Sequence, residues 1–323
     1  MNCIALGMAV ASGLLANHPA DALVRELRRV AAELAKTERI DAESMRTFFA
    51  NSPEFRRGLL QLEDPDQPLK GKRYVEVAAF ALARDPDDNV RTHAACALVH
   101  RGLGSAIAEQ AVAEALADPS RDVRLFACQA LGLGNRKGQA PAIRKLLGDP
   151  EEDVRMMAVT TLGRLRDTDS LDAVLKQHEI EKVSEETAYQ FGIALARLGE
   201  KKVSRMLIRA SMASDNWNIR YFVADALADV ITVDAVPTAM ECFALELKRI
   251  IRGDKHTGFD ERIYQKLIAI LAKRTGKDFG DDPTAWAKWW DTARVPYAAP
   301  ALELDVEAVK QAYAEHLKSK AAK

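Results

Sequence analysis

The fold is decided by residues 118–132, DPSRDVRLFACQALG, in which an Asp-Pro pair is followed after three residues by a Val-Arg pair. The same signature recurs on both sides of this stretch, with its valine at Val90 and at Val154. A related copy without the proline runs from Asp215 to Ile219-Arg220. A signature that returns after a fixed step of roughly 30 residues is typical of an array of stacked supersecondary units.

One member of this array is degenerate. The distance from Val154 to Ile219 is about twice the usual step, which places another unit at Thr187-Ala188, where the Val-Arg pair is absent. A leucine nevertheless keeps the same register in every copy. These leucines are Leu98, Leu131, Leu162, Leu195 and Leu227.

The apolar spacing within each copy predicts helices. Val123, Ala127, Ala130 and Leu131 recur at the i, i+4, i+7 and i+8 spacing of one helix face. Each unit is therefore predicted to be two helices joined at the Asp-Pro turn. The acidic or amide residue just before each Val-Arg or Ile-Arg pair is expected to cap the second helix. The predicted pairs are 73–83 with 90–100, 105–117 with 123–132, 139–147 with 154–165, 170–178 with 184–198, 201–212 with 219–230, and 237–251 with 261–272.

This periodicity also predicts how the chain is organised. Residues 1–70 contain helices without the register and are expected to form an N-terminal cap, with Pro65, Pro68 and Gly71 at its junction with the array. The array itself occupies residues 71–272, and residues 273–323 form a C-terminal cap and terminal helix. The predicted fold class is an all-α, right-handed α-solenoid of about six helix pairs with helical caps.

Charge and cysteine content restrict the classes of function. The 323 residues include 46 basic and 47 acidic ones, for a net charge of −1. No overall field would attract nucleic acid or an anionic membrane, although a local patch is compatible with this balance. The cysteines form no Cys-x-x-Cys pair and are interpreted as reduced structural thiols. They are Cys3, Cys96, Cys128 and Cys242.

The apolar stretch 1–16 bears on localisation. It is too short to span a bilayer, and no Lys or Arg precedes it, unlike the basic start of a signal peptide. We expect a packed first helix and a cytoplasmic protein. The alternative is export, if residues 1–22 act as a signal peptide.

The arrangement Asp-Pro-x-x-x-Val-Arg followed by Ala-x-x-Ala-Leu-Gly resembles the HEAT repeat, in particular the short variety shared with phycobilisome-lyase-like proteins. The resemblance covers residues 73–272. It implies an α-solenoid whose second helices line the concave face. It implies little about chemistry, because this repeat serves many unrelated tasks.

A tryptophan cluster follows the array. Asp282 and Pro283 are expected to start a helix, on which Trp286, Trp289 and Trp290 share one face. The segment resembles the terminal segment of a number of bacterial HEAT-repeat proteins. An aromatic ligand platform is the alternative, but we favour a structural cap because a solenoid must close its last apolar face.

Motifs for catalysis or metal binding are not found in the sequence. His93 and His100 lie about 10 Å apart on one helix, too far to share an ion. A single His-Glu pair, His178-Glu179, excludes the HEAT-like deoxyhypusine hydroxylases, which need several. The near-neutral charge argues against the HEAT-like alkylpurine DNA glycosylases, and no phosphate loop or nucleophile elbow is present. We therefore expect no catalytic residue, cofactor or metal.

The repeated arginines have two interpretations. In one, each arginine is bonded to an acidic group of a neighbouring turn, and the set forms a ladder along the stack. In the other, the set forms a row of anion-binding forks. The ladder is the favoured interpretation. The arginines are Arg91, Arg124, Arg155 and Arg220.

A candidate partner-binding ridge lies one step further along each second helix. The residues there fall outside the core stripe yet are mostly large and apolar, which is typical of a partner site when they are exposed. Packing between adjacent units is the alternative. The candidates are Leu125, Met156, Tyr189 and Tyr221, preceded by Thr92.

These observations favour a non-catalytic protein-interaction module or scaffold that binds another protein on its concave face. Two other classes of function stay open. One is a phycobilin-lyase-like enzyme, or lyase subunit, acting on a protein-bound chromophore. The other, less favoured, is nucleic-acid binding. No membrane span is expected.

Overall fold

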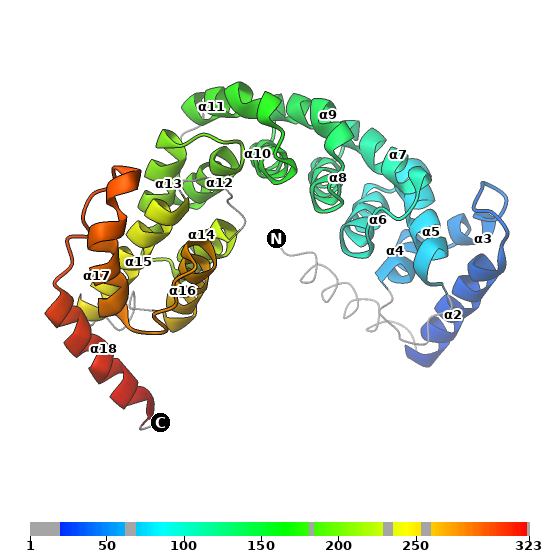
Figure 1. Cartoon of the computed structure of the whole chain (residues 1–323). Coiled ribbons are helices and arrows are strands. Elements are labelled where there is room, and N and C mark those ends of the chain that lie inside the picture. Colours follow the sequence, from blue (N-terminus) through cyan, green and yellow to red (C-terminus); the bar gives the residue numbers. More distant parts are fainter. Residues whose placement is uncertain (1–19, 62–68, 181–183, 229–234, 253–259, 322–323) are drawn as a thin grey trace. The chain divides into compact units, whose positions relative to one another are not determined.

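The computed structural model describes residues 20–61, 69–180, 184–228, 235–252 and 260–321 (Figure 1). Within these ranges every regular element is a helix, so the all-α solenoid prediction is confirmed. The predicted first helix or signal peptide, and the junction prolines Pro65 and Pro68, lie outside the described residues. The chain divides into two compact units, Met1–Leu165 and Arg166–Lys323.

In the first unit, α2 (Ala20–Lys36), α3 (Arg46–Phe49) and α4 (Pro53–Gln61) precede the regular helix pairs. The second helices of successive pairs pack side by side, α6 on α8 and α8 on α10 (Figure 1). Short 3-10 turns flank α9 and extend α7. The pairs are α5 (Gly71–Arg84) with α6 (Asp88–Arg101), α7 (Ala106–Glu114) with α8 (Arg121–Leu133), and α9 (Ala140–Lys145) with α10 (Glu152–Leu165).

The second unit continues the pattern and ends with two further helices, α17 (Pro283–Ala293) and α18 (Val306–Ala321). The second helices α12, α14 and α16 pack in succession as one layer, and the first helices α13 and α15 pack together as another. The pairs are α11 (Leu171–Ile180) with α12 (Glu185–Arg197), α13 (Lys202–Met212) with α14 (Trp217–Leu227), and α15 (Ala235–Arg252) with α16 (Glu261–Thr275).

The register leucines form the centre of each repeat. All five are at most 1% exposed, including Leu195 of the degenerate unit. Small residues allow the neighbouring helices to approach closely. At Gly192 of α12, an added Cβ would lie 3.1 Å from the backbone nitrogen of Ile208 on α13. A side chain at this position would therefore push the two helices apart.

The prediction about helix caps is wrong. Asn89, Asp122, Asp153 and Asn218 all lie inside the first turns of their helices rather than before them. These helices begin two residues earlier than predicted, at Asp88, Arg121, Glu152 and Trp217. In α6 the N-cap is instead Asp87, which accepts from the N–H of Val90, and in α14 it is Asn216, which accepts from the N–H of Asn218.

The aspartate of each Asp-Pro pair closes the turn itself. Asp118 accepts the N–H of Ser120 at 2.8 Å, and Asp149 accepts that of Glu151 at 3.0 Å. Such a bond to the backbone two residues further on is an Asx turn. It fixes the direction in which the second helix leaves the turn.

The repeated arginines connect successive turns in the first unit. Arg91 donates from Nε and Nη2 to Asp118 at 2.8 and 3.0 Å, and Arg124 donates in the same way to Asp149 at 2.8 Å for both bonds. The row extends back to α4, where Arg56 makes the same bidentate contact with Asp85 at 2.8 and 2.9 Å. These bonds occupy the edge of each guanidinium that an external anion would need.

The other two arginines share part of this geometry. Arg155 donates from Nη1 to the carbonyl groups of Asp149 and Pro150 at 2.8 and 2.9 Å. Arg220, 1% exposed, donates to the carbonyl of Ser214 at 2.9 Å and to the carboxylate of Glu246 at 3.2 Å. Here the carboxylate of Glu246, which lies on helix α15, thus takes the place of the turn aspartate.

The tryptophan helix α17 starts as predicted, with Asp282 as its N-cap and Pro283 at its first position. Trp286 and Trp290 are 0% and 1% exposed and belong to the core of the second unit, whereas Trp289 is half-buried against that core. The indole N–H of Trp286 donates to the carbonyl of Gly280 at 3.0 Å. Two of the three indoles are therefore closed to any ligand.

Candidate functional site

The predicted ridge residues differ in exposure. On the first unit, Leu125 of α8 is half-buried, but Met156 of α10 is only 5% exposed. The prediction that Met156 contributes to an exposed ridge is therefore wrong, and Thr92 is also 5% exposed. Both side chains are therefore removed from the surface.

On the second unit, the predicted residues Tyr189 and Tyr221 are half-buried and belong to a larger exposed cluster. Phe222, 52% exposed, stacks on Tyr189 with ring centroids 6.2 Å apart. Phe222 also contacts Tyr221 at 6.3 Å, and Tyr221 contacts Trp217, 43% exposed, at 6.3 Å. We call these four side chains the aromatic strip.

Two cations from α16 lie over two rings of the strip. The Arg262 guanidinium lies 4.7 Å from the ring centroid of Trp217, and the Lys266 ammonium lies 4.8 Å from that of Tyr221. At these distances the positive charge is attracted to the face of the ring. The cations hold the rings in place and give the strip a positive edge.

Neighbouring carboxylates balance part of this charge. Lys266 pairs with Asp225 at 2.5 Å, and that hydrogen bond raises the pKa of Lys266. Arg262 pairs with Asp260 at 2.7 Å, which raises the pKa of Arg262. Both cations stay charged at neutral pH while their charge is partly compensated.

A small hollow continues the strip between α14 and α16. Its volume is about 240 Å³, and its lining combines apolar side chains such as Ile270 with the cations Lys266, Lys273 and Arg274. Asp225 is the acidic lining residue. An aromatic surface beside a hollow with a basic edge provides both apolar contact area and a position for an acidic group.

Trp217 and Phe222 were missed by the sequence analysis, although the register contains a signal for Trp217. The equivalent position in the other units is charged: Asp88, Arg121, Glu152 and Glu185. A tryptophan at a position that is charged in the other helix pairs indicates an exposed apolar side chain. The Arg262 and Lys266 contacts had no such signal, because they depend on how α16 packs on α14.

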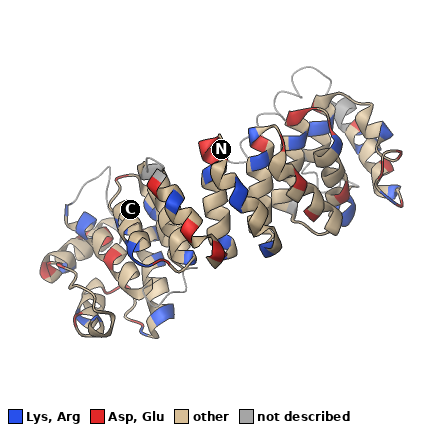
Figure 2. Ribbon diagram, turned by 90° about the horizontal axis from the view of Figure 1, so that it is seen from above, with Lys and Arg blue, Asp and Glu red and all other residues tan. Residues whose placement is uncertain are grey.

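Other types of site find no support in the described part of the chain. No group of three or more His, Cys, Asp or Glu residues there is arranged to hold a metal ion. Cys96, Cys128 and Cys242 are free thiols, and burial raises the pKa of Cys128 to about 12. Among the described helices, none combines the length and the apolar character that crossing a membrane requires. Figure 2 shows basic and acidic residues interspersed along the helices of each unit.

The match to a known family agrees with this description of the repeats. The family model for HEAT repeats matches residues 108–181, which include α8 and α10. No curated protein sequence matches the chain. Among solved structures, a chain of the complex of CpcE and CpcF of phycocyanin lyase from Nostoc sp. PCC7120 aligns at 20% identity with a TM-score of 0.47, over 74% of this chain and 99% of that chain. Residues 108–181 are thus similar to HEAT repeats, and the stacked helix pairs of the structure agree with that match.

Proposed function

We propose that this protein is a protein-binding module and that the aromatic strip contacts its partner. The observation that carries the proposal is the exposure of Trp217 and Phe222, at 43% and 52%, beside the half-buried Tyr189 and Tyr221. Large exposed aromatic side chains that lie together are uncommon on a free surface and dominate the energetics of many interfaces.

The arrangement favours a protein over a nucleic acid. Arg262 and Lys266 over the rings are each paired with a carboxylate, so the strip lacks the strong unpaired positive charge that binds a phosphate backbone. The rings also contact one another at their edges or faces, which leaves an apolar surface of the kind found at the centre of protein interfaces.

The first experiment identifies what contacts the strip. A photo-crosslinking amino acid is introduced in place of Phe222, and in a control variant in place of Ile107, an apolar side chain of the first unit that is 56% exposed. After irradiation in the source cells, we expect a protein adduct at position 222 that is absent at position 107. Equal crosslinking at both positions would argue against the strip.

The second experiment measures the partner's affinity. Trp217→Ala and Phe222→Ala are each expected to weaken binding at least tenfold, because the truncation of a central aromatic commonly costs about 2 kcal/mol or more. The melting temperature should stay near that of the parent, since both side chains are exposed. Ile107→Ala is the matched control and should bind normally. Normal binding by both strip variants would contradict the proposal.

A further inference from the structure

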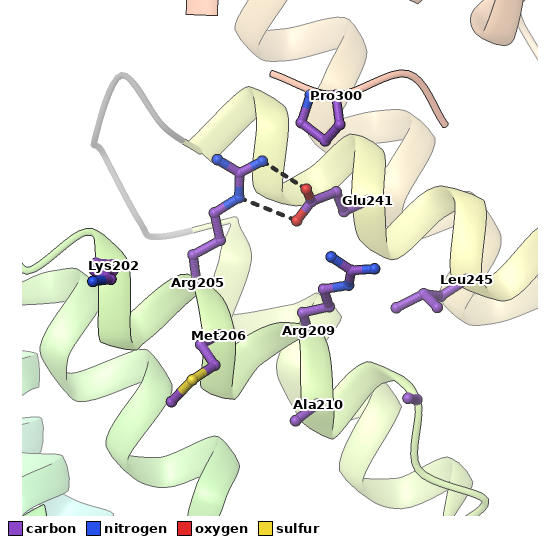
Figure 3. Close-up of a pocket in the computed structure, with 9 residues that line it drawn as sticks. Lys202, Arg205, Met206, Arg209, Ala210, Glu241, Leu245 and Pro300 are labelled. Atoms are coloured by element: carbon purple, nitrogen blue, oxygen red, sulfur yellow. Dashed lines mark hydrogen bonds and ion pairs between the residues drawn. The ribbon is translucent and has the colours of Figure 1, made fainter. Parts of the chain in front are cut away.

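A groove lies on the other helix layer of the second unit (Figure 3). It runs between the first helices α13 and α15 and is bordered by Pro300, with a volume of about 660 Å³. This volume is within the range of about 300–1,000 Å³ that is usual for ligand sites. The groove uses none of the residues of the strip.

The floor of the groove is apolar and open. Met206 is 58% exposed, an unusual exposure for a long apolar side chain, and it lies beside Ala210 on the same helix. Leu245 of α15 and Pro300 complete the apolar lining. A contiguous apolar surface edged by charge is typical of an interaction site.

The edge of the groove is positively charged. Lys202, Arg205 and Arg209 follow the i, i+3, i+7 spacing of one face of α13. Arg205 donates to Glu241, the acidic lining residue, at 3.1 and 2.6 Å, as Figure 3 shows. Both side chains of this pair are therefore satisfied within the protein.

Lys202 and Arg209 differ from Arg205 in this respect. Within the described residues, neither side chain has an ion pair or hydrogen bond, and both are exposed. The groove thus carries two uncompensated positive charges beside its apolar floor. Figure 3 shows Arg209 extending from α13 toward α15, between Glu241 and Leu245.

We infer that this groove binds a segment of another protein in which an acidic side chain adjoins an aliphatic one. The carboxylate meets Arg209, whose planar guanidinium binds carboxylates with two parallel hydrogen bonds, while Lys202 adds a second charge. The aliphatic side chain lies on Met206 and Leu245. This second surface lies on a different layer from the strip, so the inference does not rest on the proposed function.

The test observes the Met206 methyl group directly. The whole protein is labelled with 13C-methyl methionine, and the Met206 resonance is assigned from its loss in Met206→Leu. The probe is the peptide acetyl-Glu-Leu-Leu-Glu-amide, and acetyl-Lys-Leu-Leu-Lys-amide is its opposite-charge control. We expect the acidic peptide to shift the Met206 resonance saturably and the basic peptide to leave it in place.

Charge-reversal variants then locate the acidic side chain. Arg209→Glu should weaken binding of the acidic peptide at least tenfold. Lys176→Glu, a reversal at an exposed cation of α11, should leave binding unchanged. Any one of three results would overturn the inference. These are the absence of a Met206 shift at millimolar acidic peptide, equal shifts with the two peptides, and normal binding of the acidic peptide by Arg209→Glu. Phe222→Ala should leave the Met206 shift intact, which separates failure here from failure of the strip.

Discussion

Asp149 performs two structural tasks with one carboxylate. It closes its own turn by accepting the N–H of Glu151, and it accepts two hydrogen bonds from Arg124 of the preceding unit. Burial of the side chain opposes its ionisation, but the hydrogen bonds from Arg124 and Glu151 outweigh this effect, so the pKa of Asp149 lies below its usual value. The ionised form therefore stabilises the contact between successive helix pairs of the first unit.

Replacement of this carboxylate is expected to weaken the first unit. Asp149→Asn keeps the size of the side chain and removes the charge, which leaves Arg124 without its partner, and we expect the free energy of unfolding to fall by about 2–3 kcal/mol in urea titrations at neutral pH. Asp122→Asn is the matched control. Its pair with Arg121 is half exposed on both sides, so the loss should stay below about 1 kcal/mol.

The same variant has a defined pH dependence. Because the folded pKa of Asp149 is lowered, its contribution is complete above the unfolded pKa of about 3.9 and is lost as the pH falls through the folded pKa. The difference between the parent and Asp149→Asn should therefore shrink below about pH 4. A difference that persisted undiminished at lower pH would show that the carboxylate is not the source of the stability.

For single residues, the sequence predicted which residues recur better than it predicted how exposed each side chain is. The recurrence of Arg91 and Arg124 was visible because every unit uses the same turn, and a repeated contact produces a repeated residue. Exposure leaves a weaker signature, which the register shows for Trp217 but not for Met156. Met156 and Tyr221 occupy equivalent register positions, yet Met156 is 5% exposed and Tyr221 contributes to the strip.

The helices themselves were predictable because local rules determine them. An Asp-Pro turn and an apolar stripe of helical period specify where each pair divides, and even the degenerate unit kept Leu195 buried. The errors occur at the ends of helices. The predicted caps Asn89 and Asn218 lie inside their helices because the aspartate or asparagine of the turn, rather than the residue before Val or Ile, satisfies the first backbone donors.

The helix α17 offers a test of capping at the scale of one element. Trp286 is fully buried, and its ring meets Phe279 edge-on at 4.9 Å between centroids. Trp286→Ala should lower the free energy of unfolding by about 3–5 kcal/mol. Truncation of the half-buried Trp289 to alanine should lower the free energy of unfolding by less. Thermal and urea unfolding, followed by circular dichroism, would measure both.

Trp217→Ala is the control for these two variants. It removes the same side chain from an exposed position, so its effect on stability should stay within about 1 kcal/mol. If Trp286→Ala unfolded like the parent, or if Trp217→Ala were as unstable as Trp286→Ala, burial in α17 would not be what closes the array.

The whole chain consists of two compact units built from the same repeat. In such arrays each repeat contacts its neighbours, so stability is approximately a sum of local terms and adjacent interfaces. A change in one unit therefore need not destabilise a distant one equally. The distribution of tryptophan makes this measurable, because all four tryptophans, Trp217, Trp286, Trp289 and Trp290, lie in the second unit.

Tryptophan fluorescence thus reports unfolding of the second unit alone, whereas far-ultraviolet circular dichroism reports the helices of both. For Asp149→Asn, which acts in the first unit, we expect the dichroism transition in urea to move to lower concentration and broaden while the fluorescence transition moves less. For Gly192→Ala, where the new methyl group meets the backbone of α13, the fluorescence transition should move by at least as much as the dichroism transition. If both probes moved together in both variants, the two units would unfold as a single cooperative body, and the destabilisation of either would be transmitted through the whole array.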